Sequence, residues 1–223
     1  MKRQISESLL LGGLLAVVGG YLDAYTYLLR GGVFANAQTG NIVLLGIRLA
    51  EGAWGQVGVY LIPVLTYAAG VLLADWLRGV RTGLHWRQLS VGLECGILLA
   101  AAFVPQGELD PLVNLAISFV CAVQTESFRK VAGSAMATTM CTGNLRSGTA
   151  LLGRWLRRED LSALGRSLRY FAVIGCFILG AALGTVLCGP LGEKAVLVPC
   201  GGLAAAFGLM FMEAKEEEHE LAG

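Results

Sequence analysis

The chain has 223 residues, of which 55% are hydrophobic and 15% are charged, and its mean hydropathy is +0.64. A soluble domain of this size usually has about 25% charged residues. The apolar residues fall in blocks of roughly 17 to 24, long enough to cross a bilayer core of about 30 Å. A soluble helical bundle is disfavoured because these blocks lack polar faces. The net charge of +1 indicates no nucleic-acid partner, so the composition predicts an all-α integral membrane protein.

Six apolar segments are predicted to span the membrane. They cover about residues 8–29, 57–77, 89–104, 112–128, 168–187 and 195–212. The first follows Lys2 and Arg3 as a signal peptide would, but it is too long for a typical signal core and is predicted to be retained. The third and fourth are separated by a Pro- and Gly-containing break at 105–111, and residues 213–223 form an acidic tail.

Cysteine and histidine give no sign of a metal centre. The six cysteines lie in or beside apolar segments and form no Cys-x-x-Cys or Cys/His pattern, so they are interpreted as small packing residues. His85 and His219 lie in a predicted loop and in the tail. No cofactor is indicated, and no nucleophile and base are paired. The prediction is therefore that the protein is not an enzyme.

Two less apolar segments, 33–50 and 134–156, decide the topology. If both cross the membrane there are eight spans; if both dip in and return, there are six. With six spans and a cytoplasmic N-terminus, thirteen cations lie inside and three (Arg30, Arg48 and Lys194) lie outside, as the positive-inside rule requires. Eight spans weaken this bias, so six spans and two re-entrant segments are favoured. The inner cations are Lys2, Arg3, Arg78, Arg81, Arg87, Arg129, Lys130, Arg146, Arg154, Arg157, Arg158, Arg166 and Arg169.

The tripeptide Thr-Gly-Asn occurs at 39–41 and again at 142–144. Asp23 lies eighteen residues before Asn41, and Glu126 lies eighteen residues before Asn144, so one offset of 103 residues relates both pairs. This indicates two related halves. Because each half has three spans, the second enters the membrane in the opposite orientation, as an inverted-topology repeat. The predicted halves are residues 1–107 and 108–212, followed by the cytoplasmic tail 213–223.

The repeated unit is predicted to lie where each half breaks its helical path. Thr39 or Asn41, and Thr142 or Asn144, are candidate N-caps of two short helices. Their N-termini would face the centre and favour an anionic group. Alternatively, these side chains only satisfy the broken backbone. The candidate substrate-binding residues are Gln38, Thr39, Gly40, Asn41, Gln124, Thr142, Gly143 and Asn144.

Three acids lie within predicted spans, where a charged side chain costs at least about 2.5 kcal/mol. Asp23, Glu126 and Glu94 are therefore expected to face the interior and are the candidate proton-coupling groups. Two alternatives stay open: Glu126 pairs with Arg129 or Lys130 at the inner surface, and Asp23 caps the short helix that follows it.

Two stretches of the first half carry a resemblance to a known family. Gly20-Tyr-Leu-Asp-Ala-Tyr-Thr-Tyr-Leu28 and Val33-Phe-Ala-Asn-Ala-Gln-Thr-Gly-Asn41 resemble the bacterial YoaK-like membrane family, a domain of unknown function. Gln124 and the second Thr-Gly-Asn are similar too. The resemblance implies an inner-membrane protein of about six spans without a settled activity, and it names neither a substrate nor site residues.

The leading hypothesis is a small secondary transporter for a small polar or anionic solute, with protons as the candidate coupling ion. A channel or facilitator with two re-entrant segments is the first alternative. A non-transporting partner or sensor, using the arginine-rich segment 146–169 as a docking or anionic-lipid surface, is the second. The expected partners are the lipid bilayer and the solute, and a homo-oligomer stays open. The expected location is the bacterial inner membrane, with both termini cytoplasmic.

Overall fold

The computed structural model describes residues 8–79, 86–131 and 134–221, and nearly all of their regular structure is helical. Each predicted span is a helix, and the two short helices are present as predicted. In chain order the helices are α1 (Leu9–Leu29), α2 (Gln38–Ala50), α3 (Trp54–Gly79), α4 (Trp86–Ala101), α5 (Asp110–Ser127), α6 (Cys141–Leu156), α7 (Ala163–Leu191) and α8 (Leu197–Leu221). A 3₁₀ turn at Gly192–Val196 joins α7 to α8. The two-residue strands β1 (Lys130–Val131) and β2 (Ser134–Ala135) pair antiparallel between α5 and α6.

Local sequence signals set both ends of α1. Ser8 is its N-cap, and the Ser8 Oγ accepts a hydrogen bond from the Leu11 N–H at 3.1 Å. The helix is followed by Gly31 and Gly32, whose φ values of 85° and 75° lie in the left-handed region that glycine adopts without strain. The chain turns back there toward the centre of the molecule.

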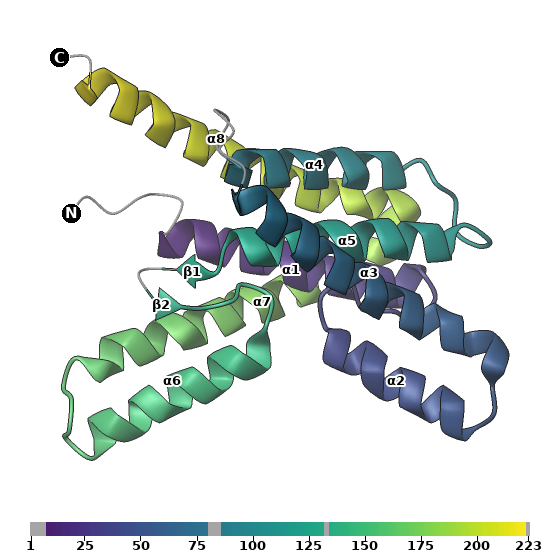
Figure 1. Ribbon diagram of the computed structural model, residues 1–223, viewed down its shortest axis with the longest axis horizontal. Coiled ribbons are helices and arrows are strands. Elements are labelled where there is room, and N and C mark those ends of the chain that lie inside the picture. Colours follow the sequence, from purple (N-terminus) through teal and green to yellow (C-terminus); the bar gives the residue numbers. More distant parts are fainter. Residues whose placement is uncertain (1–7, 80–85, 132–133, 222–223) are drawn as a thin grey trace.

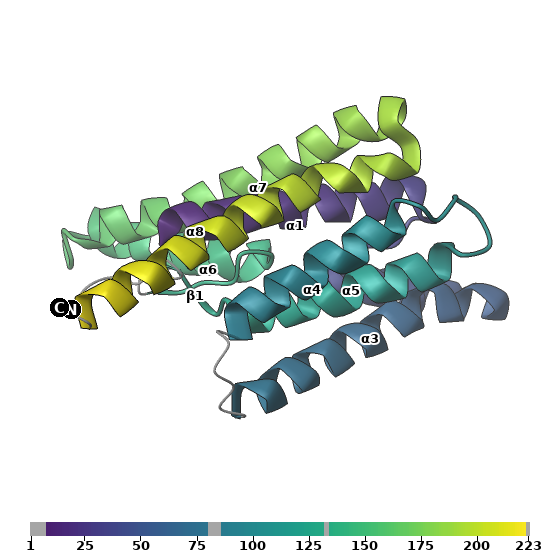
Figure 2. The same ribbon diagram turned by 90° about the horizontal axis from the view of Figure 1, so that it is seen from above.

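The two predicted halves are packed into each other. α1 packs most extensively on α7, and α5 packs most extensively on α3, so the first helix of each half contacts the other half. α2 packs on α3 and α6 packs on α7, while α4 and α8 contact each other. Seen from above, α7 and α3 lie at opposite edges with the other long helices between them (Figure 2). One continuous core therefore contains residues from both halves.

Glycines permit the closest of these helix contacts. A Cβ added to Gly180 of α7 would overlap the Val17 carbonyl of α1. A Cβ added to Gly70 of α3 would lie 2.6 Å from the Phe119 carbonyl oxygen of α5. Small residues let helix backbones approach in this way in membrane bundles.

The short helices α2 and α6 both begin near the middle of the molecule and diverge toward opposite ends (Figure 1). α2 runs toward the end at which α1 finishes, and α6 runs toward the end at which α5 finishes. They have 13 and 16 residues, which at 1.5 Å per residue gives about 20 and 24 Å, less than the bilayer core of about 30 Å.

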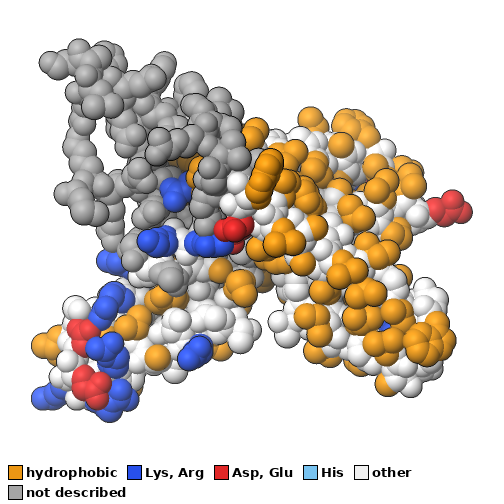
Figure 3. All heavy atoms as spheres, in the orientation of Figure 1, with side chains coloured by type: hydrophobic (Ala, Val, Ile, Leu, Met, Phe, Trp, Pro, Cys, Tyr) orange, Lys and Arg blue, Asp and Glu red, His pale blue; other side chains and the backbone are white. Residues whose placement is uncertain are grey.

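Large apolar side chains cover much of the surface (Figure 3), among them Leu72, Phe103 and Val186, each at least 70% exposed. Such a surface is typical of contact with lipid rather than water. Within the described residues, three segments are long and apolar enough to cross a membrane: Leu9–Leu29, Trp54–Trp76 and Ala163–Met210, the last of which includes parts of both α7 and α8. The chain is therefore a membrane protein, as its composition predicts.

Lys and Arg side chains gather at the end where α6 joins α7, further ones lie above it beside the grey atoms, and almost none is seen toward the opposite end (Figure 3). Arg154, Arg157 and Arg158 belong to this end. Lys194 lies in the 3₁₀ turn at the opposite end of α7. Lys2, Arg3 and Arg81, which were predicted to be inner cations, lie outside the described residues.

Candidate functional site

The two Thr-Gly-Asn units occupy the same place in two different helices. Each lies at the second to fourth positions, of α2 in one case and of α6 in the other. The Nδ2 of Asn41 donates to the Phe34 carbonyl at 2.7 Å, and the Nδ2 of Asn144 donates to the Ala137 carbonyl at 2.6 Å. Both bonds reach back seven residues, so the two units close their preceding loops with the same contact.

The prediction that the Thr and Asn residues of these units are the N-caps of α2 and α6 is wrong. The N-cap positions are Ala37 and Met140, and neither makes a side-chain capping bond. Asn41 and Asn144 are buried inside the first helical turn, with exposed fractions of 0% and 3%. Their side-chain amides donate hydrogen bonds to loop carbonyls that no helix pairs. This is the alternative interpretation, in which these side chains satisfy the broken backbone.

We call residues 30–37 the first linker and residues 128–140 the second linker. Both linkers reach Gly19, the midpoint of α1. The Nδ2 of Asn36 donates to the Gly19 carbonyl at 3.2 Å. Thr139, which lies 103 residues after Asn36, packs so closely that its Cγ2 would be 2.6 Å from a Cβ on Gly19. The hydroxyl of Thr139 is also 2.9 Å from that of Thr125 on α5. Two positions related by the offset of 103 residues thus meet at one point.

Asp23 lies one helical turn beyond this meeting point and is 5% exposed. Its Oδ1 accepts a hydrogen bond from the Asn36 N–H at 2.6 Å, which ties the first linker to α1. Its Oδ2 has no hydrogen-bond partner among the described residues. The carboxyl group therefore positions the linker with one oxygen and leaves the other available.

Glu94 of α4 is completely buried, and its Oε2 accepts a hydrogen bond from the Nε2 of Gln124 on α5 at 2.9 Å. The Oε1 atoms of both side chains have no partner among the described residues. Cys121, one turn before Gln124, is also completely buried. The hydroxyl of Thr125, which follows Gln124, lies 2.9 Å from that of Thr139, so this part of α5 lies beside the point where the linkers reach α1. The structure thus gathers Asp23, Asn36, Glu94, Cys121 and Gln124 into one region, which we call the buried polar cluster.

Glu126 is not part of this cluster. It forms an ion pair with Arg129, which also lies 3.5 Å from Asp75 of α3. This is the local pairing that the sequence left open as the alternative to a coupling role. The contact ties α5 to α3 near the cation-rich end.

The other predicted binding residues lie outside the cluster. Gln38 donates to the Ala35 carbonyl at 2.9 Å and accepts from Asn41 at 2.9 Å, so it braces the start of α2. Gly40 lies against the Phe34 ring, where a Cβ would approach within 2.8 Å. Thr39, Thr142 and Gly143 are exposed.

Sequence reasoning missed Asn36 and Cys121 and treated Arg30 as an outer-loop cation. The Arg30 side chain is completely buried, and its Nη1 bonds the Asp110 Oδ1 at 2.8 Å. The signal that could have found Asn36 is its spacing, because it lies 103 residues before Thr139. No group of three or more His, Cys, Asp or Glu residues suited to a metal ion is found in the described part of the chain.

The fold and the buried polar cluster define an α-helical membrane protein with carboxyl and amide groups at the junction of two breaks in its helices. The chain belongs to the family described as "Protein of unknown function (DUF1275)", which matches residues 11–209. This confirms the resemblance seen in the sequence.

One curated relative carries a membrane description. The chain is 29% identical over 144 residues to "UPF0700 transmembrane protein YoaK" of Bacillus subtilis (strain 168). The alignment covers 60% of this chain and 62% of that relative, so the chain spans less than two thirds of the relative's length. No solved structure matches the chain.

Proposed function

We propose that the protein is a small secondary transporter that moves a small polar or anionic solute and couples this movement to protons. The observation that carries the proposal is the pair of buried carboxyl groups, Asp23 and Glu94, each with one oxygen that no described residue bonds. Asp23 lies one turn from the point where both linkers reach the middle of α1. Glu94 is connected to the same point through Gln124, whose neighbour Thr125 contacts Thr139.

The chemistry of this pair supports proton exchange. The donors that bond or approach Asp23 and Glu94 are backbone N–H groups and side-chain amides, all of which are neutral. Two uncompensated negative charges would be very costly in a bilayer interior. A proton taken up by either group removes that cost, and its release would follow a change in exposure to water.

The architecture that fits this function has six spans and two re-entrant segments, arranged as inverted repeats of residues 1–107 and 108–212. The matched contacts of Asn41 and Asn144 support it, as does the divergence of α2 and α6 toward opposite ends (Figure 1). Transporters with inverted repeats commonly bind substrate where broken helices meet. The cation-rich end is assigned to the cytoplasm of a bacterial inner membrane, so both termini are cytoplasmic.

Replacing Asp23 with asparagine and Glu94 with glutamine is expected to abolish proton uptake by the reconstituted protein. The measurement is the charge displaced by a pH jump across proteoliposomes on a solid-supported membrane, which needs no known solute. The double variant should lose at least about 90% of the signal, because the isosteric amides cannot bind a proton. Glu51→Gln, an exposed acid after α2, is the matched control and should retain it.

An unchanged signal in the double variant would remove the coupling hypothesis. Glu126→Gln tests the third acid: a retained signal leaves it as an ion-pair partner of Arg129, and a lost signal adds it to the coupling groups. Once a solute is found, accumulation against its gradient should show the same dependence.

The topology has its own prediction. In a cysteine-free background, a cysteine at Glu108 should react with an impermeant reagent only from outside, and one at Arg158 only from inside. The loops that carry them lie at opposite ends of the molecule (Figure 1). Eight full spans would place both residues on the same side, so same-side labelling contradicts the inverted repeat.

A channel or facilitator is the second candidate. It is favoured by the two helix N-termini that start near the centre, since re-entrant segments of this kind build ion filters from backbone dipoles (Figure 1). Solute flux that survives in the Asp23→Asn, Glu94→Gln variant would select this candidate over the coupled transporter.

A further inference from the structure

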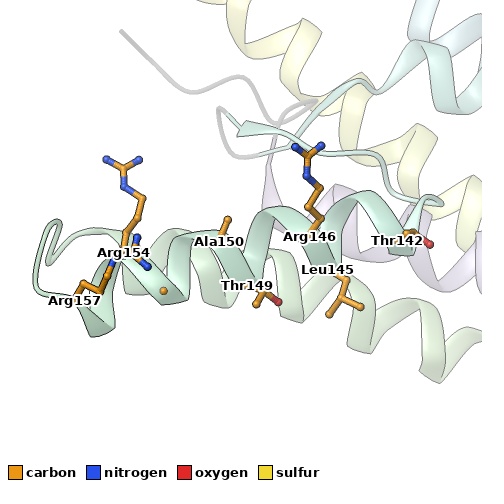
Figure 4. Close-up of a pocket in the computed structure, with 8 residues that line it drawn as sticks. Thr142, Leu145, Arg146, Thr149, Ala150, Arg154 and Arg157 are labelled. Carbon is orange, nitrogen blue, oxygen red and sulfur yellow. The ribbon is translucent and has the colours of Figure 1, made fainter.

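One face of α6 carries an open groove of about 730 Å³ (Figure 4). Its lining residues recur at helical spacing from Thr142 to Arg157 and include Arg146, Thr149 and Arg154. The neighbouring face of α6 packs on α7, where the Ser167 hydroxyl donates to the Gly148 carbonyl at 2.7 Å. The groove is therefore on the outside of the helix pair.

Two of its arginines are available for a ligand. Arg146 and Arg154 make no hydrogen bond or ion pair with any described residue, and they extend from the same side of α6 (Figure 4). They are eight residues apart, which is about 12 Å along the helix.

The acids near this groove are engaged by other arginines. Arg157 donates to both carboxylate oxygens of Glu159, at 2.6 and 3.2 Å, and this contact lowers the pKa of Glu159 below its usual value. Asp160 is ion-paired with Arg166. Neither acid makes a hydrogen bond or ion pair with Arg146 or Arg154, although the charge of Arg154 helps to lower the pKa of both acids. The hydrogen-bond donors of both guanidinium groups therefore remain for a ligand.

The equivalent face of α2 has a different character. The offset of 103 residues places Ile42 and Val43, which are 53% and 56% exposed, where α6 has Leu145 and Arg146. That face suits acyl chains. An arginine that faces acyl chains costs at least about 2.5 kcal/mol unless it has a polar partner. Arg146 therefore requires a polar partner, whereas the apolar residue at the equivalent position of α2 does not.

We propose that the groove on α6 binds one anionic phospholipid of the cytoplasmic leaflet, with its phosphate at Arg154 and its glycerol esters near Arg146. Guanidinium groups bind phosphate oxygens through paired hydrogen bonds, and basic pockets on the cytoplasmic side of membrane proteins bind lipid head groups. Ala150, which extends from the same side of α6 as the two arginines, leaves apolar surface between them for the lipid (Figure 4).

A lipid fits this groove better than a soluble anion does. The groove opens along the side of a helix rather than into an enclosed cavity, so a free ion would be held from one direction only. A lipid is already confined to the bilayer beside α6 and adds apolar contact to the charge pairing. The inference rests on the proposed orientation of the chain, but not on transport.

The test measures lipid retention by the purified full-length protein. Native mass spectrometry in detergent containing equal amounts of phosphatidylglycerol and phosphatidylcholine should show preferential binding of phosphatidylglycerol. Arg146→Gln, Arg154→Gln should weaken that binding by about thirtyfold, since each arginine near the surface contributes roughly fivefold. Arg158→Gln removes a charge at the same end but outside the groove, and it should weaken binding by less than about threefold.

Equal lipid retention by the double variant and the native chain overturns the proposal. An equal loss in Arg158→Gln also does, because the effect would then be general charge. If inorganic phosphate displaces phosphatidylglycerol at equal concentration, the site belongs to a free oxyanion instead. Should the glutamine variant fail to fold, Arg146→Lys, Arg154→Lys keeps the charge and should still reduce retention, since lysine lacks the paired geometry.

Discussion

Replacing Arg30 with leucine is expected to lower the free energy of unfolding by about 3 to 5 kcal/mol, because it leaves a buried network without its cation. The guanidinium bonds Asp110 at 2.8 Å and the Tyr25 hydroxyl at 3.0 and 2.8 Å. It also donates to three carbonyls, those of residues 101, 104 and 105, at 3.3, 2.8 and 3.2 Å. One side chain therefore joins α1 to the break between α4 and α5.

The same network continues beyond Arg30. The Asn114 Nδ2 donates to the Arg30 carbonyl at 2.6 Å, and the Tyr25 hydroxyl donates to the Glu193 carbonyl at 3.2 Å. The network thus connects α1, α5 and the turn after α7. A buried acceptor left unpaired costs about 1 to 3 kcal/mol. Because removing the Arg30 side chain leaves several acceptors unpaired, we expect it to lower the free energy of unfolding more than the loss of any other side chain of this network.

Unfolding in mixed micelles, followed by tryptophan fluorescence, gives the free energy for this comparison. The control is Arg48→Leu, which breaks an exposed ion pair with Glu51 of the same 2.8 Å length. That pair is expected to contribute no more than about 1 kcal/mol. Similar losses in the two variants would show that the Arg30 network does not stabilise the fold. Arg30→Lys should fall between them, since lysine keeps the charge but cannot make the forked contacts.

The burial of Arg30 is also an example of a feature that the sequence alone could not predict. The charge count places it among three outer cations, which is a statement about topology and not about burial. Its partners outside α1 lie 71 to 80 residues away, and only the tertiary fold brings the end of α1 to the break between α4 and α5. The helices themselves could be predicted, because each depends on the length of a local apolar run and on glycines that end it.

In the candidate site, too, some features could be predicted from the sequence and others could not. The offset of 103 residues predicts that Asn41 and Asn144 have equivalent roles, and the matched bonds to residues 34 and 137 agree with it. The spacing could not decide whether these side chains cap the following helix or bond the preceding loop, because an asparagine at this position can reach either. The contact of Glu94 with Gln124 likewise joins residues 30 apart in sequence, on two helices whose rotation no local pattern reveals.

Replacing Gly180 with alanine is expected to destabilise the protein by about 3 kcal/mol or more, although alanine is the better helix former. The new Cβ would overlap the Val17 carbonyl of α1, and backbone cannot move aside as a flexible side chain does. Overpacking usually costs about 1 to 3 kcal/mol, and this collision lies in the most extensive helix pair of the fold. The reverse contact is equally tight, since a Cβ on Gly20 would overlap the Phe177 carbonyl.

Gly175→Ala provides the matched control within the same helix. No side chain and no backbone of another helix lies within 4 Å of a Cβ at Gly175, so the helix propensity of alanine should stabilise this variant by up to about 1 kcal/mol. Opposite signs for two identical substitutions five residues apart would isolate the close approach of α1 and α7 from any general effect on α7. If Gly180→Ala instead stabilises the protein, the two helices are farther apart than this packing requires. The proposed joining of the two halves through α1 and α7 would then lose its main physical support.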